Sequence, residues 1–365
     1  WDAIADSSKY VVVQTAPSVR ATLGECFGMP IGTNVEGKMV AALRRLGFDK
    51  IFDTDFAADL TIVEEANELV ERIKNNGTLP MITSCSPGWI KYCEHYYPDM
   101  LDHLSTCKSP QQMSGAIIKT WYAEKMGIDP KDIVVVGIMP CTAKKFETKR
   151  DDQAASGYPD VDYSLTTREL GRMIESAGIY FKHLPDEEFD NPLGDSTGAA
   201  VIFGATGGVM EAALRTAVEK LSGEELKSLD FTEVRGTDGI KEASYTVNGM
   251  EVKVCVVSGL ANANAIMEKV KNGTADYHFI EIMGCPGGCV NGGGQPIQHA
   301  VVRNFVDLKA RRAAALYEAD KDMPLRKSHE SEAVKRLYDE FLGEPGSHKA
   351  HEVLHTSYVA RPKYK

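Results

Sequence analysis

The chain has 365 residues, of which 43% are hydrophobic and 25% charged, a composition typical of a globular protein with a large apolar core. Its formal net charge of −11 argues against a nucleic-acid partner, because phosphates call for stripes of Lys and Arg. No uninterrupted apolar run of about 18 residues is present, so we expect no membrane span. The first residue is Trp1 rather than Met, which predicts a processed or truncated N-terminus.

The first part of the chain alternates between short apolar runs and helical patterns. Strands are predicted at 10–16, 50–54 and 80–85, and helices near 37–47 and at 61–73. Strands that are separated by single helices pair in parallel through right-handed crossovers. This part therefore predicts a parallel sheet covered by helices.

The alternation continues to about residue 296, where a polar helical tail begins. A hairpin signal, Asn248–Gly249, lies within 233–259. The remaining predicted elements are a strand at 132–141, a helix at 166–178, a strand, glycine turn and helix across 200–221, a helix at 261–273 and a strand at 277–285.

The simplest fold is α/β, with two lobes that are each a mostly parallel twisted sheet flanked by helices. We expect approximate lobes at 1–110 and 111–296, with a cleft between them and a helical C-terminal wrap at 297–365. Together these parts form a single predicted domain, 1–365.

The eight cysteines divide into two kinds, and their density is too low for a disulfide scaffold. Cys93 and Cys255 lie in apolar patterns and are predicted core residues, whereas Cys26 and Cys107 are ambiguous, with packing favoured. The other four follow strand-like runs in loops rich in Gly and Pro, where ligands bind in α/β proteins; they are Cys85, Cys141, Cys285 and Cys289.

The segment EIMGCPGGCVNGGGQP (281–296) combines Cys285 and Cys289 with many glycines. Thiolates are the usual ligands of iron–sulfur clusters, and glycines let the backbone approach a bulky inorganic group. The spacing alone is equally compatible with a flexible glycine loop that holds a chance cysteine pair. Zinc is less favoured, because structural zinc sites prefer C-x2-C pairs and the chain has no second pair.

Three loops together are more specific: ITSCSPGW (82–89), IMPCTAKKFE (138–147) and 281–296. They resemble the three signature motifs of the FeFe (iron-only) hydrogenase family, and the resemblance runs over essentially the whole chain. It implies an H-cluster, in which a 4Fe–4S cluster is bridged through cysteine to a two-iron unit with CO, cyanide and a dithiolate bridge.

The resemblance assigns roles to residues of this chain. Cys141, Cys285 and Cys289 match metal ligands, with Cys289 as the bridge, and Lys144 matches the lysine that hydrogen-bonds a cyanide. The residues that match the wall of the two-iron pocket are Pro17, Ser18, Pro110, Gln111, Met139, Phe203, Gly204 and Met283. Without the motifs around them, Met139 and Met283 would be interpreted as core.

The first loop departs from the family pattern, which has two adjacent cysteines where this chain has Cys85 and Ser86. A gapless match makes Cys85 the proton carrier and Ser86 the fourth cluster ligand, although an alkoxide is harder and more basic than a thiolate. Alternatively, Cys85 has taken over ligation, or the substitution impairs the site. We favour Cys85 as the proton carrier and leave the role of Ser86 open.

A proton route is also implied. Glu65 and Glu68 share a helix face, and Arg72, four residues beyond Glu68, is placed to hold its carboxylate. By itself this pattern is more typical of a solvated charged face. The resemblance matches Glu65, Glu68, Ser105 and Cys85 to the family's proton path, Arg72 to its flanking arginine, and Glu147 to a suspected side route.

The expected activity is the reversible reduction of protons to H2, with electrons exchanged with ferredoxin or through a relay domain upstream of Trp1. Hydrogenase maturation proteins are implied partners, and a cytoplasmic location is expected. The alternatives are a low-activity hydrogen sensor and an inactive iron–sulfur relative. Five basic residues predict either a docking patch for an acidic ferredoxin or a solvated helix surface: Lys309, Arg311, Arg312, Arg326 and Lys327.

Overall fold

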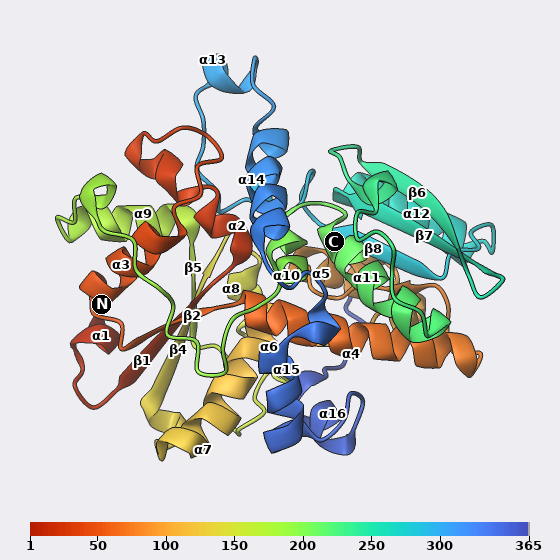
Figure 1. Cartoon of the computed structure of the whole chain (residues 1–365), viewed down its shortest axis with the longest axis horizontal. Helices are drawn as coiled ribbons and strands as arrows, with labels where there is room; N and C mark the ends of the chain where they lie inside the picture. Colours follow the sequence, from red (N-terminus) through yellow and green to blue (C-terminus); the bar gives the residue numbers. More distant parts are fainter. Residues whose placement is uncertain (364–365) are drawn as a thin grey trace.

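The computed structural model describes residues 1–363 and contains two four-stranded sheets, which lie on opposite sides of the molecule in Figure 1. In the first sheet the order is β2-β1-β4-β5 and every neighbouring pair is parallel. Its strands are β1 (Tyr10–Thr15), β2 (Lys50–Asp53), β4 (Ile133–Met139) and β5 (Tyr163–Thr166).

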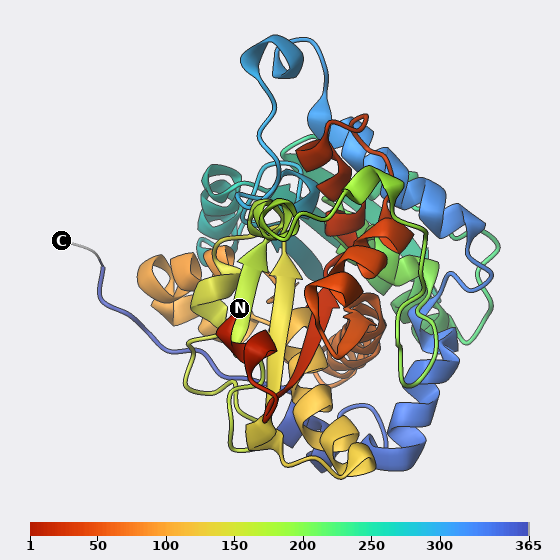
Figure 2. The same ribbon diagram turned by 90° about the vertical axis from the view of Figure 1, so that its left-hand side faces the viewer.

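The first sheet is covered on both faces, as Figure 2 shows from its side. Val11 and Val13 face one core with α3 (Glu36–Leu46), whereas Val12 faces another with α6 (Pro110–Ile117). Burial on both faces explains why these strands are continuous apolar runs rather than alternating ones.

The second sheet has the order β3-β8-β7-β6, parallel except for the antiparallel pair β6–β7. Asn248 and Gly249 both have positive φ, 50° and 78°, and form the predicted two-residue hairpin turn. The strands are β3 (Met81–Ile82), β6 (Ile240–Val247), β7 (Met250–Ser258) and β8 (Phe279–Met283).

Helices cover both faces of the second sheet as well. Apolar residues of α4 (Asp55–Lys74) and α11 (Gly208–Ser222) share one core with β7 and β8. On the other face, Cys93 and Cys255 are buried in one core with Trp89, which confirms both cysteines as core residues. The helices that pack on this face are α5 (Pro87–Tyr96) and α12 (Leu260–Lys271).

The predicted α/β class with helix-flanked sheets is confirmed, and two details differ. The predicted strand at the start of 200–221 is wrong: Gly198–Val201 is helix α10, followed by a 3-10 helix at Ile202–Gly204. These residues are buried all round, and a short apolar run has the same pattern in a buried strand and in a buried helix.

The strands are distributed differently from the approximate lobes 1–110 and 111–296. β3 lies before residue 110 but pairs with β8, whereas β4 and β5 lie after it and pair in the sheet of β1. The chain thus crosses between the sheets three times, before β3, before β4 and before β6, and residues from both sheets meet at their boundary. The remaining short helices before residue 297 are α1 (Asp2–Ala5), α2 (Pro17–Arg20), α7 (Ala123–Met126), α8 (Lys144–Glu147) and α9 (Thr167–Ser176).

The tail is helical, as predicted, and α13 projects from the body in both views (Figures 1 and 2). The prediction that five basic residues of the tail lie on the surface is wrong for two of them. Arg312 is 1% exposed and pairs with Glu25, and buried Lys327 pairs with Glu219. The tail helices are α13 (Ala300–Arg303), α14 (Leu308–Asp322), α15 (Glu332–Leu337) and α16 (His348–Leu354).

Within residues 1–363, none of the helices combines the length and the apolar composition that crossing a membrane requires.

Candidate active site

A pocket lies where the carboxyl ends of strands from both sheets converge, with about 760 Å³ of space free of protein atoms, part of it open to solvent. Ligands bind at such ends in open α/β sheets. All the predicted pocket residues line it: Pro17, Ser18, Cys85, Ser86, Pro110, Gln111, Met139, Cys141, Lys144, Phe203, Gly204, Met283, Cys285 and Cys289.

Three predicted ligands gather at one side of the pocket. Burial, and then the neighbouring Cys141 and Cys285, raise the pKa of Cys289 to about 12. Burial and then the proximity of Cys141 also raise the pKa of Cys285. Such thiols become thiolates only beside a compensating positive charge, which a metal centre supplies.

Glycines allow this convergence. Gly288 has φ 89°, and a Cβ there would lie 2.6 Å from the backbone nitrogen of Thr206. A Cβ on Gly292 would lie 2.4 Å from the carbonyl oxygen of Pro140. Larger residues would push the loops apart, so the glycines close the backbone around the thiols.

Ser86 lines the pocket together with the three thiols and is the residue that precedes α5. Its Oγ accepts a hydrogen bond of 3.0 Å from the backbone nitrogen of Gly284, in the third loop. The hydroxyl therefore joins two of the predicted loops at the edge of the pocket.

Lys144 reaches the pocket wall from α8. Its Nζ donates to the carbonyl oxygen of Cys85 at 3.1 Å and to both carboxylate oxygens of Glu147 at 3.0 Å. Glu147 also accepts from Ser109 Oγ at 2.8 Å and from Gln111 Nε2 at 2.9 Å. This buried network orients a cationic donor at the pocket.

Two polar atoms of the pocket wall are unsatisfied. Ser18 Oγ and Gln111 Oε1 are buried and have no hydrogen-bond partner among the described residues. Buried polar atoms without partners are uncommon in proteins, and these two can hydrogen-bond a group bound in the pocket. The thiols, the close backbone approach and these polar atoms together fit an iron–sulfur-based cluster.

A line of polar side chains leads from Cys85 toward the surface. Burial, and then the charge of Glu65, raise the pKa of the Cys85 thiol. Burial, and then the charge of Glu68, raise the pKa of Glu65 to about 8. The Ser105 hydroxyl lies near Glu65, whose pKa it partly lowers against the effect of burial, and its Oγ donates to Glu68 Oε2 at 3.0 Å. The structure thus brings all four predicted route residues together.

Arg72 lies at the outer end of this line of polar side chains. It donates to Glu68 Oε1 at 2.6 Å and to the carbonyl oxygen of Leu104 at 2.8 Å. The pairing four residues apart on α4 agrees with the expected geometry.

Some residues at the site were not predicted. Thr54 and Ala58 line the pocket from the start of α4. Glu281, wholly buried in β8, accepts 2.7 Å hydrogen bonds from the backbone nitrogens of Gly207 and Met210, at the start of α11. A charged residue inside a predicted buried strand was the available signal, because such a group requires buried partners.

The sequence matches two family models. Residues 9–293 match "Iron only hydrogenase large subunit, C-terminal domain", and residues 306–361 match "Iron hydrogenase small subunit". The NADP-reducing hydrogenase subunit HndD of Solidesulfovibrio fructosivorans is 53% identical over 99% of this chain and 62% of its own length. Iron hydrogenase 1 of Clostridium pasteurianum is 49% identical over 98% and 62%.

Two other relatives match this chain over about three quarters of their own length. The periplasmic Fe hydrogenase large subunit of Nitratidesulfovibrio vulgaris is 52% identical over 86% of this chain and 76% of its own. A more distant relative is the cytosolic Fe–S cluster assembly factor narfl of Xenopus tropicalis, which is 31% identical over 97% and 75%. The chain spans about three fifths of the first two relatives and three quarters of the other two.

The fold matches solved structures over nearly the whole chain. An apo FeFe-hydrogenase HydA1 variant from Chlamydomonas reinhardtii superimposes with a TM-score of 0.87 at 44% identity, over 99% of this chain and 98% of that one. A second structure, which concerns stepwise H-cluster assembly in HydA, has a TM-score of 0.86 at 43% identity, over 98% of both chains. This chain belongs to the iron-only (FeFe) hydrogenase family.

Proposed function

We propose that this chain catalyses the reversible reduction of protons to molecular hydrogen. The observation that carries the proposal is the junction at Cys85, where a pocket lined by three cysteine thiols meets a line of proton-bearing side chains. A binding protein needs the pocket alone, whereas turnover of protons also needs a route for them.

The H-cluster is the cofactor of this family, and it supplies the metal-centred exchange of electrons that joins protons into H2. Cys141, Cys285 and Cys289 are the residues that would hold it, with Ser86 at the fourth position. Lys144 would donate to an anionic ligand of the cluster, because its ammonium is held at the pocket wall by Glu147. Ser18 and Gln111 would orient the bound group through their free polar atoms.

Proton movement follows from the geometry of the side chains. Cys85 holds a proton on Sγ at the pocket wall and exchanges it with the carboxyl group of Glu65. In this route a protonated Glu65 would pass its proton to Ser105 Oγ, whose own proton is already directed at Glu68 Oε2, 3.0 Å away. Arg72 keeps Glu68 at the outer end, where 14% of its side chain is exposed.

Electrons would come from ferredoxin or through an iron–sulfur relay in other domains or subunits. Two observations support an electron relay in other domains or subunits. The first two relatives are longer than this chain, and one of them is named as the subunit of an NADP-reducing hydrogenase. Assembly of the cluster calls for hydrogenase maturation proteins. We place the protein in the cytoplasm, and cell fractionation tests this placement, because one relative is named periplasmic.

Ser86 favours one other candidate, an inactive iron–sulfur relative. A serine at a cluster position weakens ligation, and the more distant relatives include an Fe–S cluster assembly factor. The line from Cys85 to Glu68 speaks against this candidate and against a slow hydrogen sensor, since neither requires rapid proton delivery.

The test is infrared spectroscopy of anaerobically matured protein, in the window where metal-bound CO and cyanide absorb and protein groups do not. Bands that shift under H2, together with H2 evolution from a reduced electron donor, are expected. Cys85→Ser should retain the bands and lose turnover, whereas Cys26→Ser, a half-buried thiol beside Gly171, should retain both. A protein that carries the 4Fe–4S cluster but shows no bands or turnover would contradict the proposal.

A further inference from the structure

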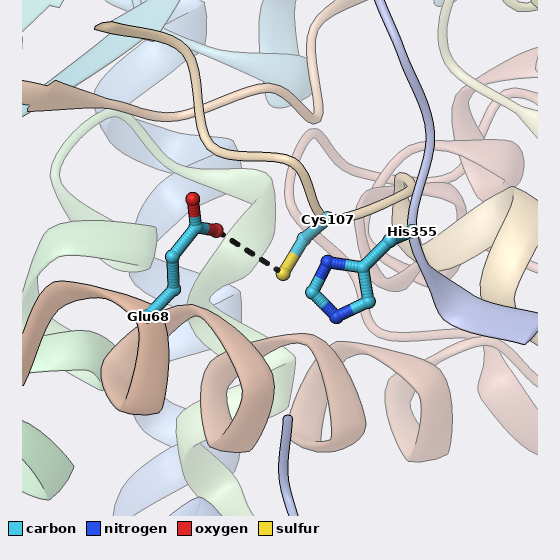
Figure 3. Close-up of side chains that lie close together, drawn as sticks. All are labelled: Glu68, Cys107 and His355. Carbon is cyan, nitrogen blue, oxygen red and sulfur yellow. Dashed lines mark hydrogen bonds between the residues drawn. The ribbon is translucent and has the colours of Figure 1, made fainter. Parts of the chain in front are cut away.

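A second cluster of metal-binding side chains lies beside the outer end of the proposed route. Glu68, Cys107 and His355 each offer a donor atom, and these atoms all lie within 4.8 Å of one another. The Cys107 Sγ is 3.9 Å from Glu68 Oε2. Figure 3 shows the carboxylate of Glu68 and the imidazole of His355 on opposite sides of this sulfur.

The backbone fixes Cys107 and His355 next to each other. They are paired in an antiparallel bridge, in which the nitrogen of Lys108 donates to the carbonyl oxygen of Leu354 and that of Thr356 to Thr106, both at 2.8 Å. The C-terminal segment therefore brings His355 close to Glu68, although the two residues are 287 positions apart in the sequence. Donors held by separate elements need little rearrangement to bind an ion.

Neighbouring side chains also orient the donors. His355 Nε2 lies 3.2 Å from Glu64 Oε2, and its Nδ1 lies 2.7 Å from Thr106 Oγ1. An imidazole that donates from Nε2 to Glu64 carries its lone pair at Nδ1, where it accepts from the Thr106 hydroxyl; a metal ion would take the place of that hydroxyl, as in carboxylate–histidine–zinc sites. Arg72 holds the carboxylate of Glu68 through Oε1. The other oxygen, Oε2, accepts from Ser105 Oγ at 3.0 Å and from the backbone nitrogen of Thr106 at 3.1 Å, and it also faces the sulfur of Cys107.

One thiol, one imidazole and one carboxylate are the donor set that Zn²⁺ prefers, whereas Mg²⁺ and Ca²⁺ prefer oxygen ligands alone. Three protein donors leave a fourth position for water. Exposure is low but not zero: 8% of the His355 side chain and 14% of that of Glu68 reach solvent, which provides a path for an ion.

We propose that Glu68, Cys107 and His355 bind Zn²⁺ or a similar borderline-soft divalent cation, and that the bound ion blocks proton transfer through Glu68. Binding replaces the thiol proton of Cys107 with the metal and releases that proton to solvent, with no change of oxidation state. The blocking effect rests on the proposed function, whereas binding of the ion does not.

Another cluster of potential metal ligands in the described structure serves as a comparison, because a lysine already pairs with its carboxylates. Glu219, His329 and Glu330 also lie close together, but Lys327 Nζ already sits 2.9 Å from a carboxylate oxygen of both glutamates. The ammonium bridges both glutamates there and no thiol is present, whereas Arg72 in the first cluster pairs with Glu68 alone, through Oε1. We therefore expect no zinc at the cluster of Glu219, His329 and Glu330.

Binding is tested on the full chain loaded with its 4Fe–4S cluster, so that the cysteines of the pocket are occupied. Equilibrium dialysis against Zn²⁺ should give one site whose X-ray absorption shows sulfur and nitrogen or oxygen neighbours. Cys107→Ser and His355→Gln should each weaken binding by at least about tenfold. His329→Gln and His348→Gln, a surface control that is 91% exposed, should bind as the wild type does.

Equal binding by the wild type, Cys107→Ser and His355→Gln would overturn the site. Two ligand variants are needed because Cys107 is wholly buried and its substitution risks the fold, whereas His355 lies at the edge of the core.

Inhibition is tested on the matured enzyme. Micromolar Zn²⁺ should slow H2 evolution, a chelator should restore it, and His355→Gln should evolve H2 at the wild-type rate without zinc and resist inhibition. Binding without inhibition would overturn the blocking effect. A matured protein that binds zinc but evolves no H2 would contradict the proposed function while supporting the site.

Discussion

The hydroxyl of Ser105 donates a hydrogen bond of 3.0 Å to Glu68 Oε2. Leu104 forms a parallel bridge with Ile82 of β3, and the backbone nitrogen of Ser105 donates to the carbonyl oxygen of Ile82, so the edge of the sheet holds Ser105 in place. Ser105 is wholly buried, and its hydroxyl also lies near Glu65, whose pKa it partly lowers against the effect of burial. The hydroxyl is therefore the link between two carboxyl groups that do not bond each other.

Replacing Ser105 with Ala should slow H2 evolution by roughly two orders of magnitude, because the link between Glu65 and Glu68 is lost. The CO and cyanide bands should remain unchanged, since Ser105 does not line the pocket. Ser244→Ala, on the exposed side of β6, is the matched control. A Ser105→Ala enzyme with the wild-type rate would remove Ser105 from the route.

Ser86→Cys should strengthen retention of the 4Fe–4S cluster, because a thiolate is a softer and less basic iron ligand than an alkoxide. The measurement is the rate at which a chelator removes iron from wild type and variant. Ser84→Cys, whose native hydroxyl bonds the carbonyl oxygen of Cys107 and does not line the pocket, is the control. Unchanged iron loss would place Ser86 outside the ligand set.

Lys144→Met should destabilise the fold by about 3 kcal/mol, because it leaves the buried carboxylate of Glu147 without its cation. Lys145→Met is the matched control: its pair with Glu169 is largely exposed, so its loss should cost less than about 1 kcal/mol. Chemical denaturation measures both. Lys144→Met should also show weaker cyanide bands after maturation, and intact bands would argue against the proposed cyanide contact.

Asp59 predicts a pH dependence of stability. Burial raises its pKa to about 7, although Thr197 donates to it through the backbone nitrogen and Oγ1 at 2.7 Å each. Between the ordinary value of 3.8 and about 7 the folded state binds more protons than the unfolded state, so stability falls as pH rises. Asp59→Asn should remove this fall. Urea unfolding of the wild type and the variant at several pH values measures the free energy of unfolding. The same pH dependence in both proteins would contradict the raised pKa of Asp59 as the cause.

The projecting segment 297–306 should tolerate a chain break. Ile297, Val301 and Phe305 are 76%, 65% and 86% exposed, and the two family models meet here, ending at residue 293 and beginning at 306. A chymotrypsin cut at Phe305 should leave two fragments that elute together in gel filtration. The reason is that Arg312 donates to Glu25 and to the carbonyl oxygen of Val290 across the break. Separate elution would show that these contacts do not suffice.

Much of the site was predictable from the sequence, because the three motifs that resemble the family are local stretches of the chain. The thiols of Cys285 and Cys289, the glycines between them and the strand before them are neighbours in the chain, and strand ends of a parallel sheet meet at one edge. The pairing of Glu68 with Arg72 was predictable for the same reason, since helical periodicity places residues four apart on one face.

Long-range partners were decided by the tertiary structure alone. Nothing in the basic stretch around Arg312 indicated that this side chain is buried on Glu25, and nothing near His355 indicated Glu68 and Cys107. Likewise, the apolar run at 198–204 became helix rather than strand. Periodicity reports that a residue is buried, but the identity of its partner depends on how distant elements pack, so the sequence determined the chemistry of the pocket and packing determined its surroundings.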